Sequence, residues 1–170
     1  MSERLIIFSH GQDGEPWGAK IVAMAEVARG MNYRVESVDY RGIADPAKRV
    51  EKLLAFCKPL NVAPVLVGSS MGGDVATAVS QSVDARGLFL LAPAFYMPGY
   101  EQYTPKPVAS PITIVHGWRD DVVPINNSIR YAREYRATLH AIDSDHRMTA
   151  NIRDIVRYLK IFLDDVGDQS

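Results

Sequence analysis

The sequence predicts an α/β protein, a three-layer sandwich in which helices cover both faces of a mostly parallel sheet of about six strands. Short apolar runs alternate with longer amphipathic segments from one end of the chain to the other. These short runs are apolar throughout, as is typical of strands that are buried on both faces. With 170 residues and roughly 150 residues per domain, we expect a single domain over residues 1–170.

The order of elements follows from these runs and from the residues that begin and end helices. The expected strands are 5–8, 34–40, 64–68, 88–91, 112–115 and 138–142. The first helix should open at Pro16 and close at Gly30, and the second should begin after Asp45 and stop before Pro59. Three more helices are expected near 72–82, after Pro124, and over 152–163, where apolar residues follow the helical period.

Composition excludes several classes of protein. The 19 Lys and Arg residues against 20 Asp and Glu give a net charge of −1, so no nucleic acid or anionic membrane is expected as a partner. A single cysteine, Cys57, forms no internal disulfide, and no Cys/His spacing suggests a metal site. The longest N-terminal apolar run, 5–8, is too short for a signal peptide or a membrane span. We therefore expect a cytoplasmic protein without cofactor or metal.

Polar residues follow the predicted strands at the point where each one ends. The carboxyl ends of parallel strands meet at one edge of a sheet, which is where open α/β sheets bind ligands. A serine, a carboxylate and a histidine appear there in that chain order, at Ser70, Asp120 and His146. Whole strand-helix units separate them. The three side chains are thus predicted to meet at one site.

The segment Gly68-Ser69-Ser70-Met71-Gly72 matches the pattern G-x-S-x-G between a strand and a helix. A nucleophilic serine in this pattern sits on a sharp turn, and the small neighbours permit close backbone packing. The helix that follows directs its N–H groups toward developing negative charge. The alternative is that Ser70 only caps this helix.

Together with the segment 116–124 (HGWRDDVVP), this pattern resembles the α/β-hydrolase superfamily, specifically its small, capless bacterial members. The resemblance runs from about Leu5 to His146. It implies a minimal fold without a cap domain, since the insertion between the fourth and fifth strands, where larger members carry a cap, is only the proline-rich stretch 92–111. It places the triad acid at Asp120 rather than Asp121, although adjacent carboxylates could exchange roles. Either carboxylate could instead cap the next helix.

The resemblance assigns the triad histidine to His146, which would accept the proton of Ser70 and pass it to the leaving group. His10, His116 and His140 compete for this role. His140 lies inside a predicted strand, while His10 and His116 each precede a glycine, which suggests turn construction.

The segment Ser9-His10-Gly11-Gln12 resembles the oxyanion-hole loop of the same family. The resemblance implies two backbone N–H donors, one from Gln12 and one from Met71. Such donors stabilise a tetrahedral oxyanion, each by about 3–4 kcal/mol. The chain departs from the glycine-rich loop of many lipases, and a plain strand-to-helix turn is the alternative.

Aromatic side chains gather where a substrate wall is expected. Phe95, Tyr96 and Trp118 are the candidate substrate-binding residues, with Tyr100 and Tyr103 nearby. Some of them could equally cover the core or form a homo-oligomer contact.

We predict a serine hydrolase acting on a small ester or thioester substrate through an acyl-enzyme. The alternatives are a non-catalytic binding protein of the same fold and a flavodoxin-like nucleotide binder. No P-loop or G-x-G-x-x-G motif supports the latter.

Overall fold

The computed structural model describes residues 2–99, 104, 106–109 and 111–169. In that part of the chain six strands form one sheet in the order β2-β1-β3-β4-β5-β6, and every neighbouring pair is parallel. The strands are β1 (Leu5–Ser9), β2 (Arg34–Val38), β3 (Val65–Ser69), β4 (Gly87–Leu91), β5 (Ile112–Gly117) and β6 (Thr138–Ile142). The helices are α1 (Ala19–Gly30), α2 (Pro46–Cys57), α3 (Met71–Ser80), α4 (Ile125–Tyr135) and α5 (Ile152–Asp168).

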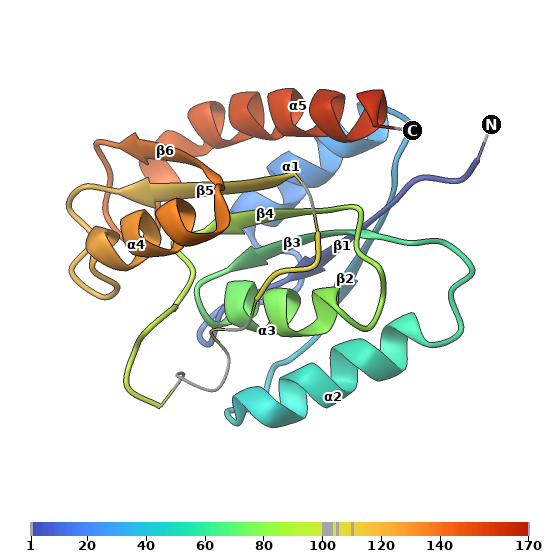
Figure 1. The fold of residues 1–170 in the computed structure, drawn as a ribbon, viewed down its shortest axis with the longest axis horizontal. Helices are drawn as coiled ribbons and strands as arrows, with labels where there is room; N and C mark the ends of the chain where they lie inside the picture. The colour runs from blue at the N-terminus through green and yellow to red at the C-terminus, as the bar shows by residue number, and fades with distance from the viewer. Residues whose placement is uncertain (1, 100–103, 105, 110, 170) are drawn as a thin grey trace.

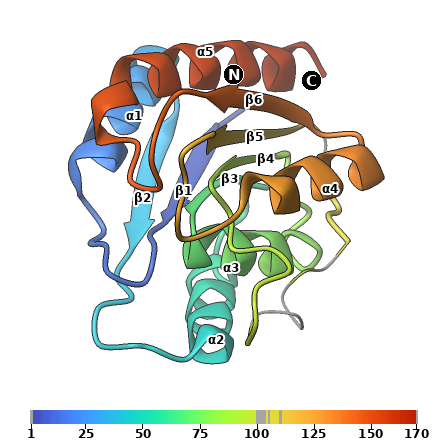
Figure 2. The same ribbon diagram turned by 90° about the vertical axis from the view of Figure 1, so that its left-hand side faces the viewer.

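Helices cover both faces of this sheet (Figures 1 and 2). Helices α1 and α5 pack on one face, where Met24, Phe89 and Phe162 belong to one apolar core. Helices α2, α3 and α4 lie on the other, where Leu53 and Val75 belong to a second core. The predicted three-layer α/β sandwich is therefore confirmed.

The strand order places a topological switch point beside β1. The chain moves from β1 to β2 in one direction and then returns past β1 to β3 and the strands beyond it. In open parallel sheets the crevice outside the carboxyl ends at such a point is the usual ligand site. The segments after β1 and β3 flank this crevice, and they carry Gln12 and Ser70.

Several predicted boundaries were wrong, and the largest difference is at α5, which ends at Asp168 rather than at 163. Helix α1 begins at Ala19 rather than Pro16, because the Pro16 carbonyl accepts from the Ser37 hydroxyl and the first helical bond starts at Gly18. Strand β2 ends at Val38, before Tyr40. Strand β5 continues to Gly117, so His116 lies inside a strand rather than in a turn.

The stretch between β4 and β5 forms no helix or strand within its described residues, which are 92–99, 104, 106–109 and 111. The predicted absence of a cap domain is thus consistent with the structure. Tyr100 and Tyr103, two of the aromatic residues expected near the substrate, lie outside the described residues. None of the described helices is both long and apolar enough to cross a membrane.

Candidate active site

Ser70 occupies the turn between β3 and α3 in a conformation that most residues avoid. Its φ is +52° and its ψ is −120°. The turn is fixed by its own backbone: the Ser70 amide donates to the Leu91 carbonyl at 2.9 Å, and the Ser70 carbonyl accepts from Gly73 at 3.0 Å and Ala94 at 3.2 Å. A strained strand-to-helix turn that is held in this way presents its side chain above the sheet edge.

Two glycines of the motif allow this turn to form. A Cβ at Gly72 would lie 2.0 Å from the Ser9 carbonyl oxygen, and one at Gly68 would lie 2.5 Å from the Gly72 oxygen. Real Cβ atoms essentially never come so close to backbone atoms. The glycines therefore let α3 begin directly against the end of β1, and Ser70 lies at that junction.

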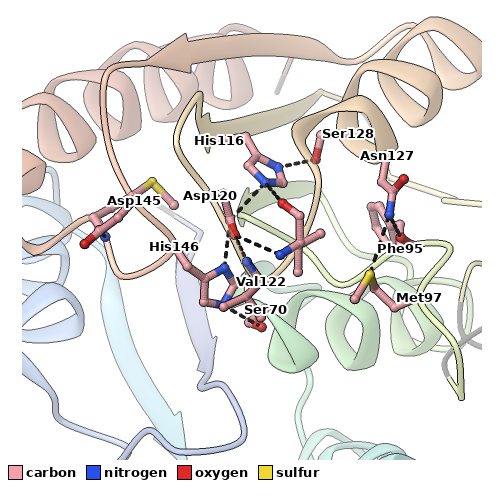
Figure 3. A network of polar contacts seen from close by, with 12 residues as sticks. Ser70, Phe95, Met97, His116, Asp120, Val122, Asn127, Ser128, Asp145 and His146 are labelled. Atoms are coloured by element: carbon pink, nitrogen blue, oxygen red, sulfur yellow. Dashed lines mark hydrogen bonds and ion pairs between the residues drawn. The ribbon is translucent and has the colours of Figure 1, made fainter.

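Ser70, His146 and Asp120 lie in hydrogen-bond contact, as Figure 3 shows. Nε2 of His146 is 3.1 Å from Oγ of Ser70, and Nδ1 of His146 is 2.7 Å from Oδ2 of Asp120. When Nδ1–H donates to the carboxylate, Nε2 carries a lone pair toward the serine hydroxyl. This arrangement permits proton transfer from Ser70 to His146.

The Asp120 carboxylate is fully buried and uses both oxygens. Oδ1 accepts from the amides of Val122 and Val123 at 2.9 and 2.8 Å, which ties the carboxylate to its own loop. Oδ2 accepts from His146. The neighbouring Asp121 is exposed. Of the two adjacent carboxylates, the structure brings Asp120 to the histidine.

His116 reaches the same carboxylate from strand β5. Its Nε2 lies 3.0 Å from Oδ2 of Asp120 and 2.9 Å from the Val123 carbonyl, and its Nδ1 lies 2.7 Å from the Ser128 hydroxyl. Burial lowers the pKa of His116, so the neutral ring donates from Nε2 and accepts from Ser128 at Nδ1. His116 is thus a buried support for Asp120.

The two remaining histidines contact other partners. His10 is buried; its Nε2 accepts from the Tyr40 amide at 2.9 Å and its Nδ1 lies 2.8 Å from the Gly11 carbonyl. His140 lies in β6 and stacks on Tyr158, with ring centroids 3.9 Å apart. Of the four histidines, His146 is the one in contact with Ser70.

The loop that carries His146 is anchored on both sides. On one side the Arg119 amide donates to the Ser144 carbonyl at 3.0 Å, and a Cβ at Gly117 would lie 2.2 Å from that same oxygen. On the other, the buried Met148 donates its amide to the Asp145 carboxylate at 2.9 Å. These contacts hold the loop against β5, next to Asp120.

The predicted oxyanion donors lie on the two segments that flank the switch point. Met71 is the first residue of α3, and the amides of a first helical turn have no partner within the helix. Gln12 belongs to the β1–α1 loop, and a Cβ on its neighbour Gly11 would lie only 3.5 Å from Cβ of Ser70. Both segments therefore approach the serine.

The three predicted substrate-binding residues differ in their surroundings. Phe95 is fully buried and stacks on Tyr131 with ring centroids 3.9 Å apart, which favours the alternative that it covers the core. Tyr96 lines a hollow of about 380 Å³ with Arg130 and Glu134, and its hydroxyl lies 3.2 Å from the Glu134 carboxylate. Trp118 is 58% exposed.

Sequence reasoning missed two buried charged residues near the site. Arg49 shares the buried face of α2 with Leu53 and Cys57, at helical spacing. Asp74 lies in the first turn of α3, among small and apolar residues. In both cases an ionisable residue at a position where the helical pattern calls for an apolar one could have indicated a buried polar group.

The Asp74 carboxyl is buried beneath the nucleophile turn. Within the described residues neither of its oxygens has a hydrogen-bond partner. Burial raises the pKa of Asp74 well above its ordinary value, and the nearby amides of Ala94 and of Asp74 itself offset this only in part. Within the described residues no hydrogen bond links this carboxyl to Ser70 or His146.

The fold and this site define a member of the α/β hydrolases. A family model described as "Alpha/beta hydrolase family" matches residues 6–166, and the chain therefore belongs to this family.

Three known proteins illustrate the likeness. The bovine mitochondrial palmitoyl-protein thioesterase ABHD10 is 23% identical over 225 residues, covering 96% of this chain and 73% of that protein. A crystal structure of an α/β-superfamily protein from Xanthomonas campestris pv. campestris is 29% identical, with a TM-score of 0.85 over 96% of this chain and 99% of that one. An α/β serine hydrolase without a lid, from Xanthomonas campestris, is 16% identical with a TM-score of 0.82, covering 96% and 83% of the two chains.

Proposed function

We propose that this α/β hydrolase is a serine hydrolase that cleaves the carboxylic ester or thioester bond of a small substrate through an acyl-enzyme. The observation that carries the proposal is the position of His146, which lies 3.1 Å from the Ser70 hydroxyl and 2.7 Å from the Asp120 carboxylate. A histidine that bridges a hydroxyl and a carboxylate in this way is the arrangement of a catalytic triad.

In the proposed reaction, Oγ of Ser70 attacks the acyl carbon while its proton moves to Nε2 of His146. Asp120 holds the ring by its Nδ1–H and stabilises the imidazolium that forms. The amides of Gln12 and Met71 are the proposed donors to the oxyanion. The tetrahedral intermediate then collapses, His146 protonates the leaving alcohol or thiol, and water releases the acyl group by the same steps.

The test is turnover of p-nitrophenyl acetate by the wild type and by two variants at neighbouring hydroxyls. Ser70→Ala should lose both the turnover of the ester and the labelling by a fluorophosphonate probe. Ser69→Ala removes the adjacent hydroxyl and should retain both. A folded wild type that neither turns over the ester nor reacts with the probe would overturn the proposal in favour of a non-catalytic binding protein.

We propose short acyl groups as the preferred substrates, since the described part of 92–111 builds no helical cap over the site. The bovine relative, named for palmitoyl-protein substrates, suggests the opposite preference. Rates with p-nitrophenyl esters from acetate to octanoate, and with the matching thioesters, decide between them. Rates that rise steadily with chain length would contradict the proposed preference.

Tyr96 and Trp118 stay predictions as substrate contacts. Trp118→Ala should raise Km for the butyrate ester more than for the acetate ester if the indole contacts the acyl chain. Equal effects on both esters would remove Trp118 from the proposed site.

The expected cytoplasmic location also stays a prediction.

A further inference from the structure

The buried Arg49 side chain is bound to three consecutive carbonyls of the β1–α1 loop. Arg49 projects from α2 and is 1% exposed. Its Nη1 donates to the carbonyls of His10 at 3.2 Å and Gly11 at 3.1 Å, and its Nη2 donates to Gln12 at 3.3 Å. Its Nε donates to Ile43 at 2.7 Å. The guanidinium therefore ties α2 to the loop that approaches Ser70.

The Gly11 carbonyl is the centre of these contacts. It accepts from Arg49 at 3.1 Å, from the Gly14 amide at 3.2 Å and, across 2.8 Å, from Nδ1 of His10. In a planar trans peptide the N–H points opposite to the carbonyl oxygen. Fixing the Gly11 oxygen therefore fixes the Gln12 N–H on the side of the peptide that faces away from the guanidinium.

The surroundings of Arg49 keep its own orientation constant. Its guanidinium lies over the Tyr40 ring, 5.1 Å from the ring centroid, and the Tyr40 amide donates to Nε2 of His10. With Nε2 accepting, the proton of the neutral His10 ring must be on Nδ1, which then donates to Gly11. Burial lowers the pKa of His10, and the nearby Arg49 charge acts in the same direction.

We propose that Arg49 is a positioning residue of the oxyanion hole, which holds the Gly11–Gln12 peptide so that the Gln12 N–H is presented to the reacting carbonyl. The inference rests on the proposed hydrolase function and adds to it a residue that does not touch the substrate. Oxyanion donors act in the transition state because they are oriented before the reaction begins. A loop that samples other peptide orientations loses this advantage.

The first test compares Arg49→Met and Arg49→Lys with Leu53→Ala in p-nitrophenyl acetate hydrolysis. Loss of one oxyanion donor costs about 10²–10³ in kcat, so a donor that is present but misoriented in Arg49→Met should cost about 10- to 100-fold. Km should change little. Lysine offers a point charge in place of a planar fork, and Arg49→Lys should fall between Arg49→Met and the wild type.

Leu53→Ala is the matched control, because Leu53 is fully buried one turn further along α2. It should lower the melting temperature at least as much as Arg49→Met while keeping kcat near the wild-type value. All rates are taken per folded molecule, well below each melting temperature. If Arg49→Met loses no more kcat than Leu53→Ala, Arg49 is structural only and the proposal fails.

The second test does not depend on activity. Amide hydrogen exchange should accelerate in peptides that cover 10–14 in Arg49→Met, but not in Leu53→Ala. Unchanged exchange in these peptides would overturn the positioning role whatever the rates show. If the wild type shows no turnover that depends on Ser70, the proposed function is overturned instead. Arg49 could then still order the loop, but it would position no oxyanion hole.

Discussion

His116 and His146 contact the same oxygen of one buried carboxylate, Oδ2 of Asp120, at 3.0 and 2.7 Å. His116 reaches it from within β5, and His146 reaches it from the loop between β6 and α5. Figure 3 shows both contacts converging on Asp120. The carboxylate is therefore fixed by a buried ring on one strand and by the partly exposed ring that contacts Ser70.

The two adjacent carboxylates should differ sharply in their effect on the proposed reaction. Asp120→Asn keeps the size of the side chain but removes its charge, and kcat should fall by about 10³- to 10⁴-fold. Asp121→Asn changes an exposed side chain and should leave kcat near the wild-type value. Steady-state hydrolysis of p-nitrophenyl acetate measures both. A larger loss in Asp121→Asn would assign the acid to Asp121.

Replacement of His116 should destabilise the fold. His116→Leu removes the ring partner of the Ser128 hydroxyl and of the Val123 carbonyl, and it removes one of the contacts of the Asp120 carboxylate. Each unsatisfied group costs about 1–3 kcal/mol, so the free energy of unfolding in urea should fall by at least that amount. His116→Gln retains an N–H donor and should lose less. Equal stabilities of the three proteins would contradict a supporting role for His116.

The glycine at 72 should be far less replaceable than the glycine at 30. Gly72→Ala drives a methyl group into the Ser9 carbonyl, whereas a Cβ at Gly30 meets nothing within 4 Å. We expect Gly72→Ala to lower the free energy of unfolding by about 3 kcal/mol. Gly30→Ala should be neutral or stabilising by about 0.4–1 kcal/mol. Thermal and urea unfolding compare the pair, and a tolerated Gly72→Ala would refute the close packing at this junction.

Replacing the buried Asp74 carboxyl by a neutral amide should stabilise the protein at neutral pH. Its pKa is raised in the folded state above the ordinary 3.8, so the folded chain binds more protons there and the free energy of unfolding falls as the pH rises above about 4. Asp74→Asn should gain about 1–3 kcal/mol at pH 7.5 and nothing near pH 3.5. The exposed Asp13→Asn is the control. A less stable Asp74→Asn at pH 7.5 would show that the carboxylate is favourably bound.

Acidification below pH 6.5 should destabilise the fold through buried histidines. Burial lowers the pKa of His10 and of His116 below the ordinary 6.5, so the unfolded chain binds more protons and the free energy of unfolding falls as the pH drops. Each histidine contributes up to about 1.4 kcal/mol per pH unit. Urea unfolding from pH 7.5 to 5.5 measures the slope.

This slope is best measured in an Asp74→Asn background, because the Asp74 carboxyl titrates with the opposite sign. His116→Gln in that background removes one titrating ring and should give a shallower slope. A free energy of unfolding that stays constant between pH 7.5 and 5.5 would mean that the buried rings do not resist protonation.

Much of the fold could be predicted because the central strands carry a strong apolar signal of their own. The strands β1, β3 and β4 are buried at nearly every position. Strands that are buried on both faces of a parallel sheet are continuous apolar runs, which can be recognised in the sequence. Asp45 accepts from the Ala47 amide as an N-cap should. The boundary at Pro16 could not be predicted, because a hydroxyl on a neighbouring strand binds its carbonyl.

The sequence by itself determined the layered α/β architecture, the turn at Ser70, and the presence of polar residues at one sheet edge, since local patterns and short motifs encode each of these. The motifs and the family resemblance favoured Asp120 and His146, and the tertiary structure shows these two side chains in contact. Only the tertiary structure placed Arg49 against the carbonyl of Gln12. The contact of Arg49 depends on the direction of its side chain and on the approach of two distant segments, which no local pattern specifies.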